Sequence, residues 1–291
     1  MVMKQKILVT VSNGQLGKEL QKAATSFRQF EFLFLAKEDL PVHDVESVKH
    51  ILKSFSPQYV INCAAYTAVD KAEQEKELAF RVNGEAVGVL ATICREGHAN
   101  FIHISTDYVF DGMASAPYKE DDPTNPQSVY GASKLEGEKQ ALQVNPDSII
   151  IRTSWVYSEF GKNFVKTMLK LLAEKEEINV VNDQFGSPTY AADLASFILQ
   201  IIASQQWEKG IYHFSNEGVI SWYEFAEFIK EWSGSSCKIN PIPTSQYPTP
   251  AKRPAWSVLN KTRVQQVYGV QLKNWRDSVT ECLKKLMNSS G

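Results

Sequence analysis

The sequence has few residues of the kinds that bind metals or form disulfides. It holds four cysteines and five histidines in 291 residues, and they are scattered, without the C-x-x-C or H-E-x-x-H spacings of common zinc sites. Cys63 and Cys94 lie in strongly apolar stretches, which is typical of small buried side chains. We therefore expect reduced thiols, as in a cytoplasmic protein, and no metal site.

Long apolar runs and an excess of charge are also lacking. No stretch approaches the ~20 apolar residues of a membrane-spanning helix, and the apolar run in MVMKQKILVTV is too short for a secretory signal. The formal net charge of -2 gives no overall attraction for nucleic acids or acidic membranes. We expect a cytoplasmic protein that has neither a nucleic acid nor a membrane as its partner.

Strand-like and helix-like segments alternate through the first half of the chain. The predicted strands are nearly continuous in apolar character, as expected for strands buried on both faces of a parallel sheet; they span residues 6–11, 32–36, 59–63, 101–105 and 148–153. Helical periodicity predicts helices over 15–25, 45–55, 71–96 and 129–143. This alternation predicts an α/β fold with a Rossmann-type, doubly wound parallel sheet.

The second half is less regular and predicts a smaller lobe. Helical patterns cover 163–174, 191–203, 221–233 and 275–286, whereas residues 240–254 hold five prolines and predict a loop. We expect an NAD(P)-binding Rossmann domain over residues 1–155, with part of 183–215 returning to it. Residues 156–291 would mainly form a C-terminal substrate-binding lobe.

The first predicted strand leads into a turn that lacks one expected glycine. Gly14 and Gly17 occupy the second and third positions of a G-x-x-G-x-x-G pattern, but Val11 occupies the first. Such a turn before a helix presents free N–H groups and a positive dipole end to a pyrophosphate. A β-branched valine restricts the backbone, so the pattern alone fits an ordinary turn equally well.

A tyrosine and a lysine at helical spacing suggest carbonyl chemistry. Tyr130 and Lys134 share one face of a predicted helix, where an ammonium would lower the pKa of the phenol. Such a tyrosine exchanges a proton with a carbonyl or alcohol oxygen, and Ser105 or Thr106 at a strand end could hold that oxygen. A chance surface pair is the alternative, but three such features converge at the carboxyl ends of the strands.

Seven stretches together resemble the extended short-chain dehydrogenase/reductase family over essentially the whole chain. They are NGQLG (13–17), NCAAYTAVDKAE (62–73), STDYVFDG (105–112), YGASKLEGE (130–138), RTSWVY (152–157), DQFGSPTYAADLA (183–195) and RPAWSVL (253–259). Within that family they are similar to the branch that reduces 4-keto-6-deoxy sugars carried on dTDP. The resemblance implies an NAD(P)H-dependent oxidoreductase of bacterial polysaccharide synthesis whose small-molecule partner is a dTDP-sugar.

The resemblance also implies roles for individual residues. Catalysis would rest on Thr106, Tyr130 and Lys134, with Ser105 as the alternative holder of the keto oxygen, and Lys134 would also bind the nicotinamide ribose. The implied cofactor contacts are Gly14, Gln15, Leu16, Gly17, Lys37, Asp44, Val45, Ala64, Ala65, Tyr66, Tyr130 and Lys134. The implied substrate contacts are Thr106, Asp107, Trp155 and Arg253.

Several of these assignments have plainer alternatives. Asp44 would serve equally as a helix N-cap, Trp155 as a core residue, and Ala64 and Ala65 as small packing residues. No acid follows the second strand, where Ala36 and Lys37 stand instead, and this favours NADPH while leaving NADH open.

Assembly and overall role also stay open. Some family members dimerise through magnesium held by glutamates, but here only Glu19 matches, so we predict no metal and a monomer or homodimer. A non-catalytic regulatory subunit of a methionine adenosyltransferase is one alternative role. A nucleotide-sugar epimerase or dehydratase is another.

Overall fold

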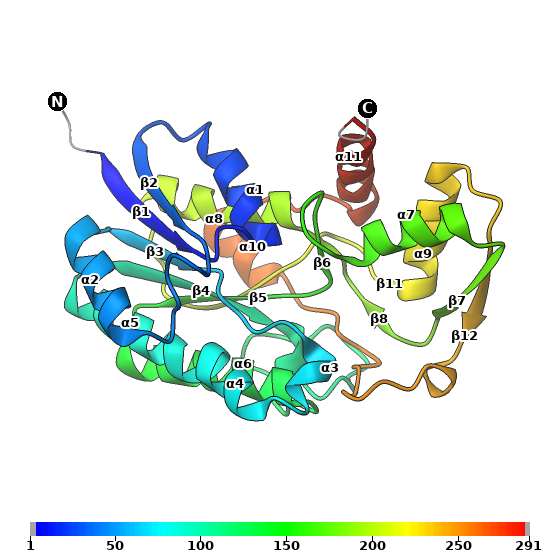
Figure 1. Cartoon of the computed structure of the whole chain (residues 1–291), viewed down its shortest axis with the longest axis horizontal. Coiled ribbons are helices and arrows are strands. Elements are labelled where there is room, and N and C mark those ends of the chain that lie inside the picture. Colours follow the sequence, from blue (N-terminus) through cyan, green and yellow to red (C-terminus); the bar gives the residue numbers. More distant parts are fainter. Residues whose placement is uncertain (1–3, 289–291) are drawn as a thin grey trace.

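A six-stranded parallel sheet forms the centre of the larger part of the molecule in this computed structural model, which describes residues 4–288 (Figure 1). Its strands are β1 (Gln5–Thr10), β2 (Phe30–Leu35), β3 (Tyr59–Asn62), β4 (Asn100–Thr106), β5 (Ile149–Thr153) and β10 (Gly210–Phe214). They lie in the order β10-β5-β4-β3-β1-β2, and every neighbouring pair is parallel. The predicted Rossmann-type sheet is confirmed.

Helices cover both faces of this sheet. One face carries α1 (Gln15–Ala24), α8 (Ala191–Ser204) and α10 (Thr262–Tyr268), and the other carries α2 (Val45–Phe55), α5 (Ala86–Glu96) and α6 (Val129–Val144). The order of connections reverses between β1 and β3, and in such sheets ligands bind at the carboxyl ends of the strands beside that reversal.

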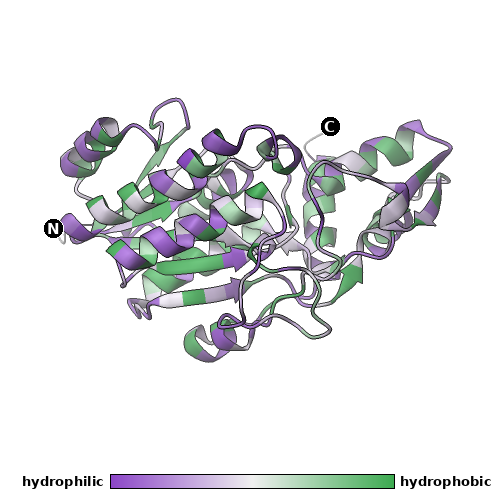
Figure 2. Cartoon of the chain, turned by 90° about the horizontal axis from the view of Figure 1, so that it is seen from below, coloured by the Kyte–Doolittle hydropathy of each residue, from purple (hydrophilic) through white to green (hydrophobic). Residues whose placement is uncertain are grey.

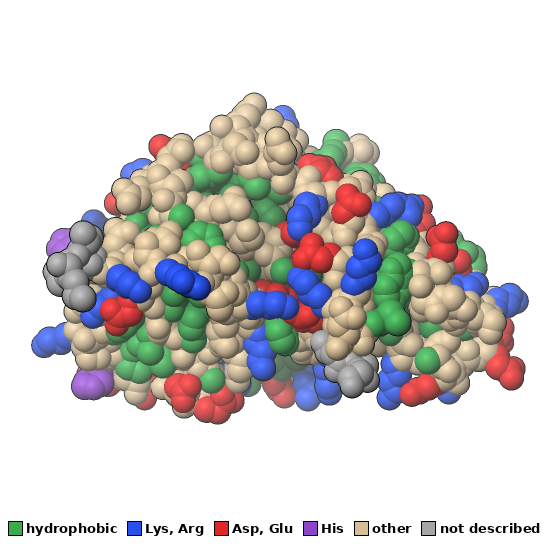
Figure 3. Space-filling view, turned by 90° about the horizontal axis from the view of Figure 1, so that it is seen from above, with side chains coloured by type: hydrophobic (Ala, Val, Ile, Leu, Met, Phe, Trp, Pro, Cys, Tyr) green, Lys and Arg blue, Asp and Glu red, His purple; other side chains and the backbone are tan. Residues whose placement is uncertain are grey.

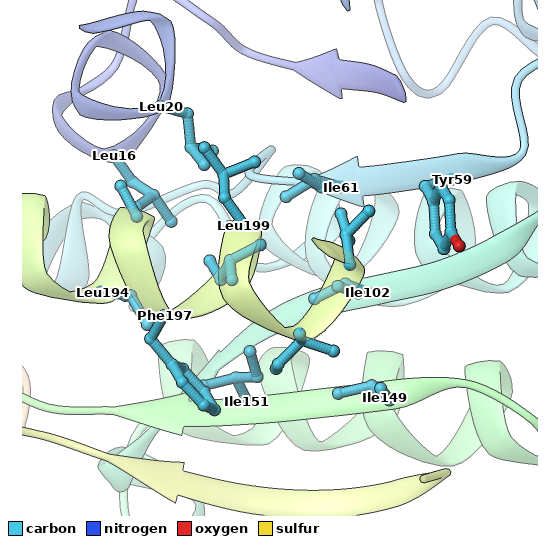
Figure 4. Packing of buried hydrophobic residues seen from close by; sticks show 14 of the residues in the cluster. Leu16, Leu20, Tyr59, Ile61, Ile102, Ile149, Ile151, Leu194, Phe197 and Leu199 are labelled. Carbon is cyan, nitrogen blue, oxygen red and sulfur yellow. The ribbon is translucent and has the colours of Figure 1, made fainter. Parts of the chain in front are cut away.

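The core lies between the sheet and these helices. Leu194, Phe197 and Leu199 of α8 are buried and lie between Leu16 and Leu20 of α1 and the isoleucines of the strands (Figure 4). In Figure 2 the strands of the central sheet are mostly apolar, whereas the helices carry both apolar and polar residues. This is the pattern from which the layered fold was predicted.

The expected single helix over residues 71–96 is wrong. The chain instead forms α3 (Val69–Ala72), α4 (Lys76–Phe80), a π-helical turn η1 (Arg81–Glu85) and then α5. In the π-turn, Asn83 accepts the Tyr66 N–H at 2.7 Å and donates to the Tyr66 carbonyl at 3.1 Å and to Ser133 Oγ at 2.9 Å. These contacts come from distant segments, so local periodicity did not show the break.

The smaller lobe combines three helices with short strand pairs. The helices are α7 (Phe164–Glu174), α9 (Trp222–Ser233) and α11 (Trp275–Asn288), and their shared core is rich in aromatic rings. The paired strands are β6 (Val156–Tyr157) with β9 (Thr189–Tyr190), β7 (Glu177–Val181) with β12 (Lys238–Ile242), and β8 (Phe185–Gly186) with β11 (Ile220–Ser221). Short 3-10 turns lie at η2 (Asp107–Val109) and η3 (Thr244–Gln246).

The predicted loop over residues 240–254 is partly wrong, because β12 extends into it as far as Ile242. Pro241 lies within β12 and is paired in register with Val180 of β7. The two-strand sheet has no central strand, and a proline is tolerated where its missing N–H faces away from the partner. The loop therefore begins after Ile242.

Candidate active site

A cavity of about 570 Å³ lies at the carboxyl ends of β1, β3, β4 and β5. Its volume is in the range of small-molecule and cofactor sites. Ten of the predicted site residues line it: Gly14, Gln15, Leu16, Gly17, Ala65, Thr106, Asp107, Tyr130, Lys134 and Trp155. The sheet thus brings together residues that are more than a hundred positions apart.

The glycine turn forms one wall of the cavity. Val11 has a φ of +50°, in the left-handed region that favours glycine, and its carbonyl accepts the Gly14 N–H at 3.1 Å. A Cβ on Gly17 would lie 2.6 Å from both the Ser12 Cα and the Val11 oxygen, so only glycine fits there. Gly14 is the N-cap of α1 and provides no side-chain cap. The turn therefore keeps the backbone shape that receives a pyrophosphate.

Ser105 and Thr106 make different contacts at the end of β4. Thr106 Oγ1 donates to Asp107 Oδ1 at 2.9 Å and accepts the Tyr108 N–H at 3.3 Å. Ser105 Oγ donates to Glu138 Oε1 at 2.5 Å and is turned towards α6. The structure therefore leaves Thr106 as the hydroxyl beside Tyr130.

Asp107 is a buried acid with an incomplete set of partners. Burial raises the pKa of its carboxyl to about 7, against the opposing effect of the Thr106 hydrogen bond. Its Oδ2 atom is buried and has no hydrogen-bond partner among the described residues. A ligand hydroxyl would satisfy this oxygen.

Tyr130 lies in the first turn of α6, held close to the loop after β4. Ser128 caps the helix by accepting the Gly131 N–H at 3.1 Å, and a Cβ on Gly131 would clash with the Tyr108 carbonyl at 2.1 Å. The Tyr108 and Tyr130 rings meet edge to face with centroids 5.5 Å apart.

The expected lowering of the Tyr130 pKa is not found. Burial raises the pKa of Tyr130 to about 12, and the side chain that opposes the rise is Thr106. Lys134 Nζ donates to the Ile104 carbonyl at 2.6 Å and contacts His103 Nε2 at 3.1 Å. Burial also lowers the pKa of Lys134 to about 8, which leaves the amine mostly protonated at neutral pH.

A buried ion pair anchors α6 to the sheet beneath these residues. Arg152 Nη2 of β5 lies 2.7 Å from Glu138 Oε2, and both side chains are almost completely buried. Glu138 also accepts the Ser105 hydroxyl. Sequence reasoning missed this pair, although Glu138 follows Lys134 by one helical turn.

Six predicted residues do not line the cavity. Asp44 caps α2 by accepting the Ser47 N–H at 3.3 Å, and Tyr66 donates its hydroxyl to Glu75. The others are Lys37 and Val45 at the surface, Ala64 in the core, and Arg253.

Arg253 lies in a neighbouring hollow rather than in the cavity. Its Nη2 pairs with Asp70 Oδ2 at 2.7 Å, whereas its buried Nη1 has no partner among the described residues.

Trp155 lines the cavity with a strained backbone. Its φ is +48°, and its ring stacks on Trp222 with centroids 3.5 Å apart. It therefore joins the cavity to the aromatic core of the smaller lobe.

Several lining residues were not predicted. They are Val11, Cys63, Thr67, Val69, Ile104, Ser105 as a wall residue, Tyr108, Thr153, Val156, Gly161, Lys162 and Leu194. Tyr108 lies inside the STDYVFDG motif, which could have identified it. Gly161 and Lys162 come from the smaller lobe, and tertiary contacts bring their loop to α1, among them Asn163 Nδ2 donating to Gln15 Oε1 at 2.9 Å.

Glu19, the residue that matches a metal position in some relatives, is buried on α1. It accepts the Ser158 hydroxyl at 2.6 Å, and burial raises the pKa of its carboxyl. Residues 4–288 contain no group of three or more His, Cys, Asp or Glu side chains that could hold a metal ion.

Comparison with known proteins identifies the family. The pattern of the RmlD substrate binding domain matches residues 4–288. The chain belongs to this family. Among curated RmlD-type relatives, dTDP-4-dehydrorhamnose reductase of Aggregatibacter actinomycetemcomitans is 43% identical, over 93% of this chain and 96% of the relative. The spore coat polysaccharide biosynthesis protein SpsK of Bacillus subtilis is 42% identical, over 96% and 97%.

Solved structures of RmlD-type proteins have the same fold. A dTDP-4-dehydrorhamnose reductase from Clostridium acetobutylicum gives a TM-score of 0.94 at 41% identity, covering 97% of this chain and all of that one. The enzyme from Bacillus anthracis in complex with NADP gives 0.94 at 36% identity, with the same coverage. The UDP-glucose 4-epimerase of Thermus thermophilus, at 19% identity and a TM-score of 0.82 over 97% of this chain and 99% of that one, shares the fold alone.

Proposed function

We propose that this protein reduces the 4-keto group of dTDP-4-dehydrorhamnose to give dTDP-L-rhamnose, with NADPH as its cofactor and NADH as a possible substitute. The observation that carries the proposal is the meeting of Thr106, Tyr130 and Lys134 in the cavity walled by the glycine turn. The relatives from Aggregatibacter actinomycetemcomitans and Clostridium acetobutylicum are named for this reaction. The role would be bacterial polysaccharide synthesis.

The cavity suits a nicotinamide dinucleotide. The close approach that Gly17 permits and the α1 N-terminus at Gly14 form a cradle for the pyrophosphate. Lys134 would hold the nicotinamide ribose. Ala65, which follows β3, and the residues of the glycine turn would line the cofactor's path. When bound, the nicotinamide supplies the hydride for the carbonyl carbon.

Tyr130 is placed to act as the proton donor. Its pKa of about 12 keeps it a phenol at neutral pH, which is the form that a donor needs. As the carbon–oxygen double bond becomes a C–H and an O–H bond, the Tyr130 O–H bond breaks and its proton moves to the keto oxygen. Thr106 would hydrogen-bond the same oxygen as its charge develops, because the Ser105 hydroxyl is engaged by Glu138.

The substrate would lie against the smaller lobe. Asp107 offers its unpartnered Oδ2 to a sugar hydroxyl, and Trp155 offers an aromatic wall. The unpartnered Nη1 of Arg253 would bind the diphosphate. Under this proposal residues 1–155, with part of 183–215, bind the cofactor, and 156–291 mainly bind the sugar nucleotide.

We further propose that the protein works in the cytoplasm, as a monomer or homodimer, without a nucleic-acid partner. None of the helices between residues 4 and 288 could cross a membrane. On the face shown in Figure 3, acidic and basic side chains lie interspersed, which provides no uniform field for a polyanion.

The test is consumption of NADPH by the purified protein with dTDP-4-dehydrorhamnose. Tyr130→Phe should abolish turnover, and Tyr223→Phe, which removes a phenol on α9 outside the cavity, should not. Full turnover by Tyr130→Phe would refute the assigned proton donor. Absence of turnover in the unaltered protein, together with co-purification with a methionine adenosyltransferase, would favour the regulatory-subunit alternative.

A further inference from the structure

The loop between β6 and α7, residues 158–163, lies against the first two turns of α1. Ser158 Oγ donates to Glu19 Oε1 at 2.6 Å, and Lys22 Nζ pairs with Glu159 Oε1 at 2.6 Å. The loop belongs to the smaller lobe, whereas α1 begins at the glycine turn of the larger part. The cofactor and substrate contacts proposed above include no residue of this loop.

Within the loop, Lys162 is held at the beginning of α1 by its two neighbours in the chain. Asn163 Nδ2 donates to Oε1 of Gln15, the first residue of α1, at 2.9 Å. A Cβ on Gly161 would lie 3.0 Å from Gln15 Cγ, and Gly161 has a φ of +66°, which favours glycine. Lys162 lies between them and lines the cavity together with Gly14 and Gln15. It is therefore placed beside the turn that would receive the pyrophosphate.

The acids of this region are engaged with other partners. Glu159 is paired with Lys22, and Glu19 accepts the Ser158 hydroxyl. Among residues 4–288, no carboxylate lies within ion-pair distance of the Lys162 ammonium. Its positive charge is thus available to an anionic ligand in the cavity.

A bound pyrophosphate would need such a charge. The N-terminus of α1 offers free N–H groups and a partial charge of only about +0.5, against a negative charge on each phosphate. The cationic side chains that line the cavity are Lys134 and Lys162. Lys134 Nζ is bound to the Ile104 carbonyl of β4, and β4 lies two strands from β1, which is about 10 Å at the usual strand spacing. Lys162 is the cation at the glycine turn.

We propose that Lys162 is a cofactor-binding residue whose ammonium pairs with the pyrophosphate of NADPH. The smaller lobe would then contribute a charge to the cofactor site as well as contacts to the sugar nucleotide. The diphosphate of the substrate has a separate candidate in Arg253, which lies in the neighbouring hollow. This inference rests on the proposed reductase function.

The test is calorimetric titration of the purified protein with NADPH. Lys162→Met keeps the apolar stem and removes the charge, and it should raise the Kd for NADPH roughly tenfold, the low end for a hydrogen bond to a charged group. Lys162→Arg keeps the charge and should bind NADPH nearly as the unaltered protein does. Lys170→Met is the control, because Lys170 is an exposed lysine of α7 that does not line the cavity.

Two further ligands identify which phosphate Lys162 contacts. NADH shares the pyrophosphate of NADPH but lacks its 2′-phosphate, so Lys162→Met should weaken both cofactors by the same factor. The binding of dTDP, which carries the diphosphate of the substrate, should not change. Raising the salt concentration from about 50 to 500 mM should weaken NADPH binding less in Lys162→Met than in the unaltered protein, because one ionic contact has been lost.

An unchanged Kd for NADPH in Lys162→Met would overturn the inference. Weakened NADPH binding with unchanged NADH binding would also overturn it and assign the lysine to the 2′-phosphate. Weakened binding of dTDP alone would overturn it and assign the lysine to the substrate.

These titrations need no turnover, so they separate the inference from the proposed reaction. A protein that binds NADPH through Lys162 and does not reduce dTDP-4-dehydrorhamnose would refute the reaction and leave the role of Lys162 intact. A protein that reduces the sugar equally well after Lys162→Met, with an unchanged Kd, would refute the role of Lys162 and leave the reaction intact. Failure of the unaltered protein to bind either cofactor would refute both.

Discussion

Val11 and Trp155 both line the cavity and both have positive φ angles, of +50° and +48°. The other described non-glycine residues with positive φ are Ser56, His98 and Gln205, which lie at or just beyond the ends of helices. Backbone strain in this protein is thus concentrated at helix ends and at the active site, where strained residues commonly contribute to function.

Val11→Gly is expected to raise the free energy of unfolding by about 1 kcal/mol. A β-branched residue at positive φ costs ~1–2 kcal/mol, and the greater conformational freedom of glycine in the unfolded state offsets part of the gain from relieving it. Urea unfolding measures the change. Ser56→Gly, at the same φ of 50°, should stabilise similarly while leaving the Kd for NADPH unchanged. A less stable Val11→Gly protein would mean that valine packing outweighs the strain.

The two hydroxyls at the end of β4 should respond differently to removal. Thr106→Val should lower kcat by roughly 100-fold through loss of one oxyanion donor. Ser105→Ala should leave kcat within a few-fold but reduce stability by ~1–3 kcal/mol, because Glu138 loses a buried partner. Steady-state kinetics and urea unfolding of both variants separate the roles, and the reverse pattern would assign the keto oxygen to Ser105.

Asp107 should make stability depend on pH. Its folded pKa of about 7 exceeds the ordinary value of 3.8, so between these values the folded state holds a proton that the unfolded state has lost. Stability therefore falls as pH rises through this window and stays low above it. Asp107→Asn should remove this pH dependence. The free energy of unfolding of the variant should exceed that of the unaltered protein by up to about 4 kcal/mol at pH 8 and differ little from it at pH 4. Parallel pH dependence in both proteins would contradict this.

At the scale of elements, hydrophobic periodicity predicted the central strands to within two residues at each end, because each strand is apolar along most of its length. It did not predict β10, which pairs in parallel with β5 from Gly210 opposite Ile149 to Phe214 opposite Thr153. It also missed the break before α5, which depends on Asn83 reaching back to Tyr66. Contacts between distant segments decide both features.

In the candidate site, too, features encoded within one segment were predicted, and contacts between distant segments were not. Thr106, Tyr130 and Lys134 belong to local motifs and were predicted, and they meet because strand ends of a parallel sheet meet. The bonds of Lys134 to His103, and of Ser105 to Glu138, involve partners on different elements. No spacing within one segment encodes them, so the sequence predicted that Thr106, Tyr130 and Lys134 assemble but not the hydrogen bonds that hold them.

The stability of the protein should depend on both partners of the ion pair between α6 and β5. Glu138→Gln or Arg152→Met alone should destabilise by ~3–5 kcal/mol, because each leaves a buried charge unpaired. The double variant Glu138→Leu/Arg152→Met should recover much of this loss. Urea unfolding of the full cycle gives the coupling energy, and strictly additive losses would show that the two charges act independently.

At the scale of the whole molecule, the cavity is closed by contacts between α1 and the loop that follows β6. Lys22 pairs with Glu159 at 2.6 Å, and Gln15 binds Asn163 at 2.9 Å. A dinucleotide lying on the glycine turn would also touch Gly161 and Lys162 of this loop. Cofactor binding should therefore stabilise both parts of the chain together.

NADPH at about 100 times its Kd should stabilise the protein by about 2.7 kcal/mol, and thermal unfolding should show this as a single transition shifted upward by several degrees. Tyr130→Phe should keep the shift, because the lost hydroxyl serves proton donation. NADH at the same concentration tests the preference between the two cofactors. No shift with millimolar NADPH would contradict the proposed cofactor site.

Tyr130, Lys134 and Glu138 follow one another at four-residue intervals along a single face of α6, and each is tied to the central sheet or to the loop after β4. The whole acid–base apparatus thus belongs to one rigid body, and the smaller lobe contributes none of it. A hinge motion between the two parts would change how tightly a sugar is gripped and leave the proton equilibria untouched. Substrate affinity and proton transfer can therefore change independently of each other in this fold, since they depend on residues in different parts of the molecule.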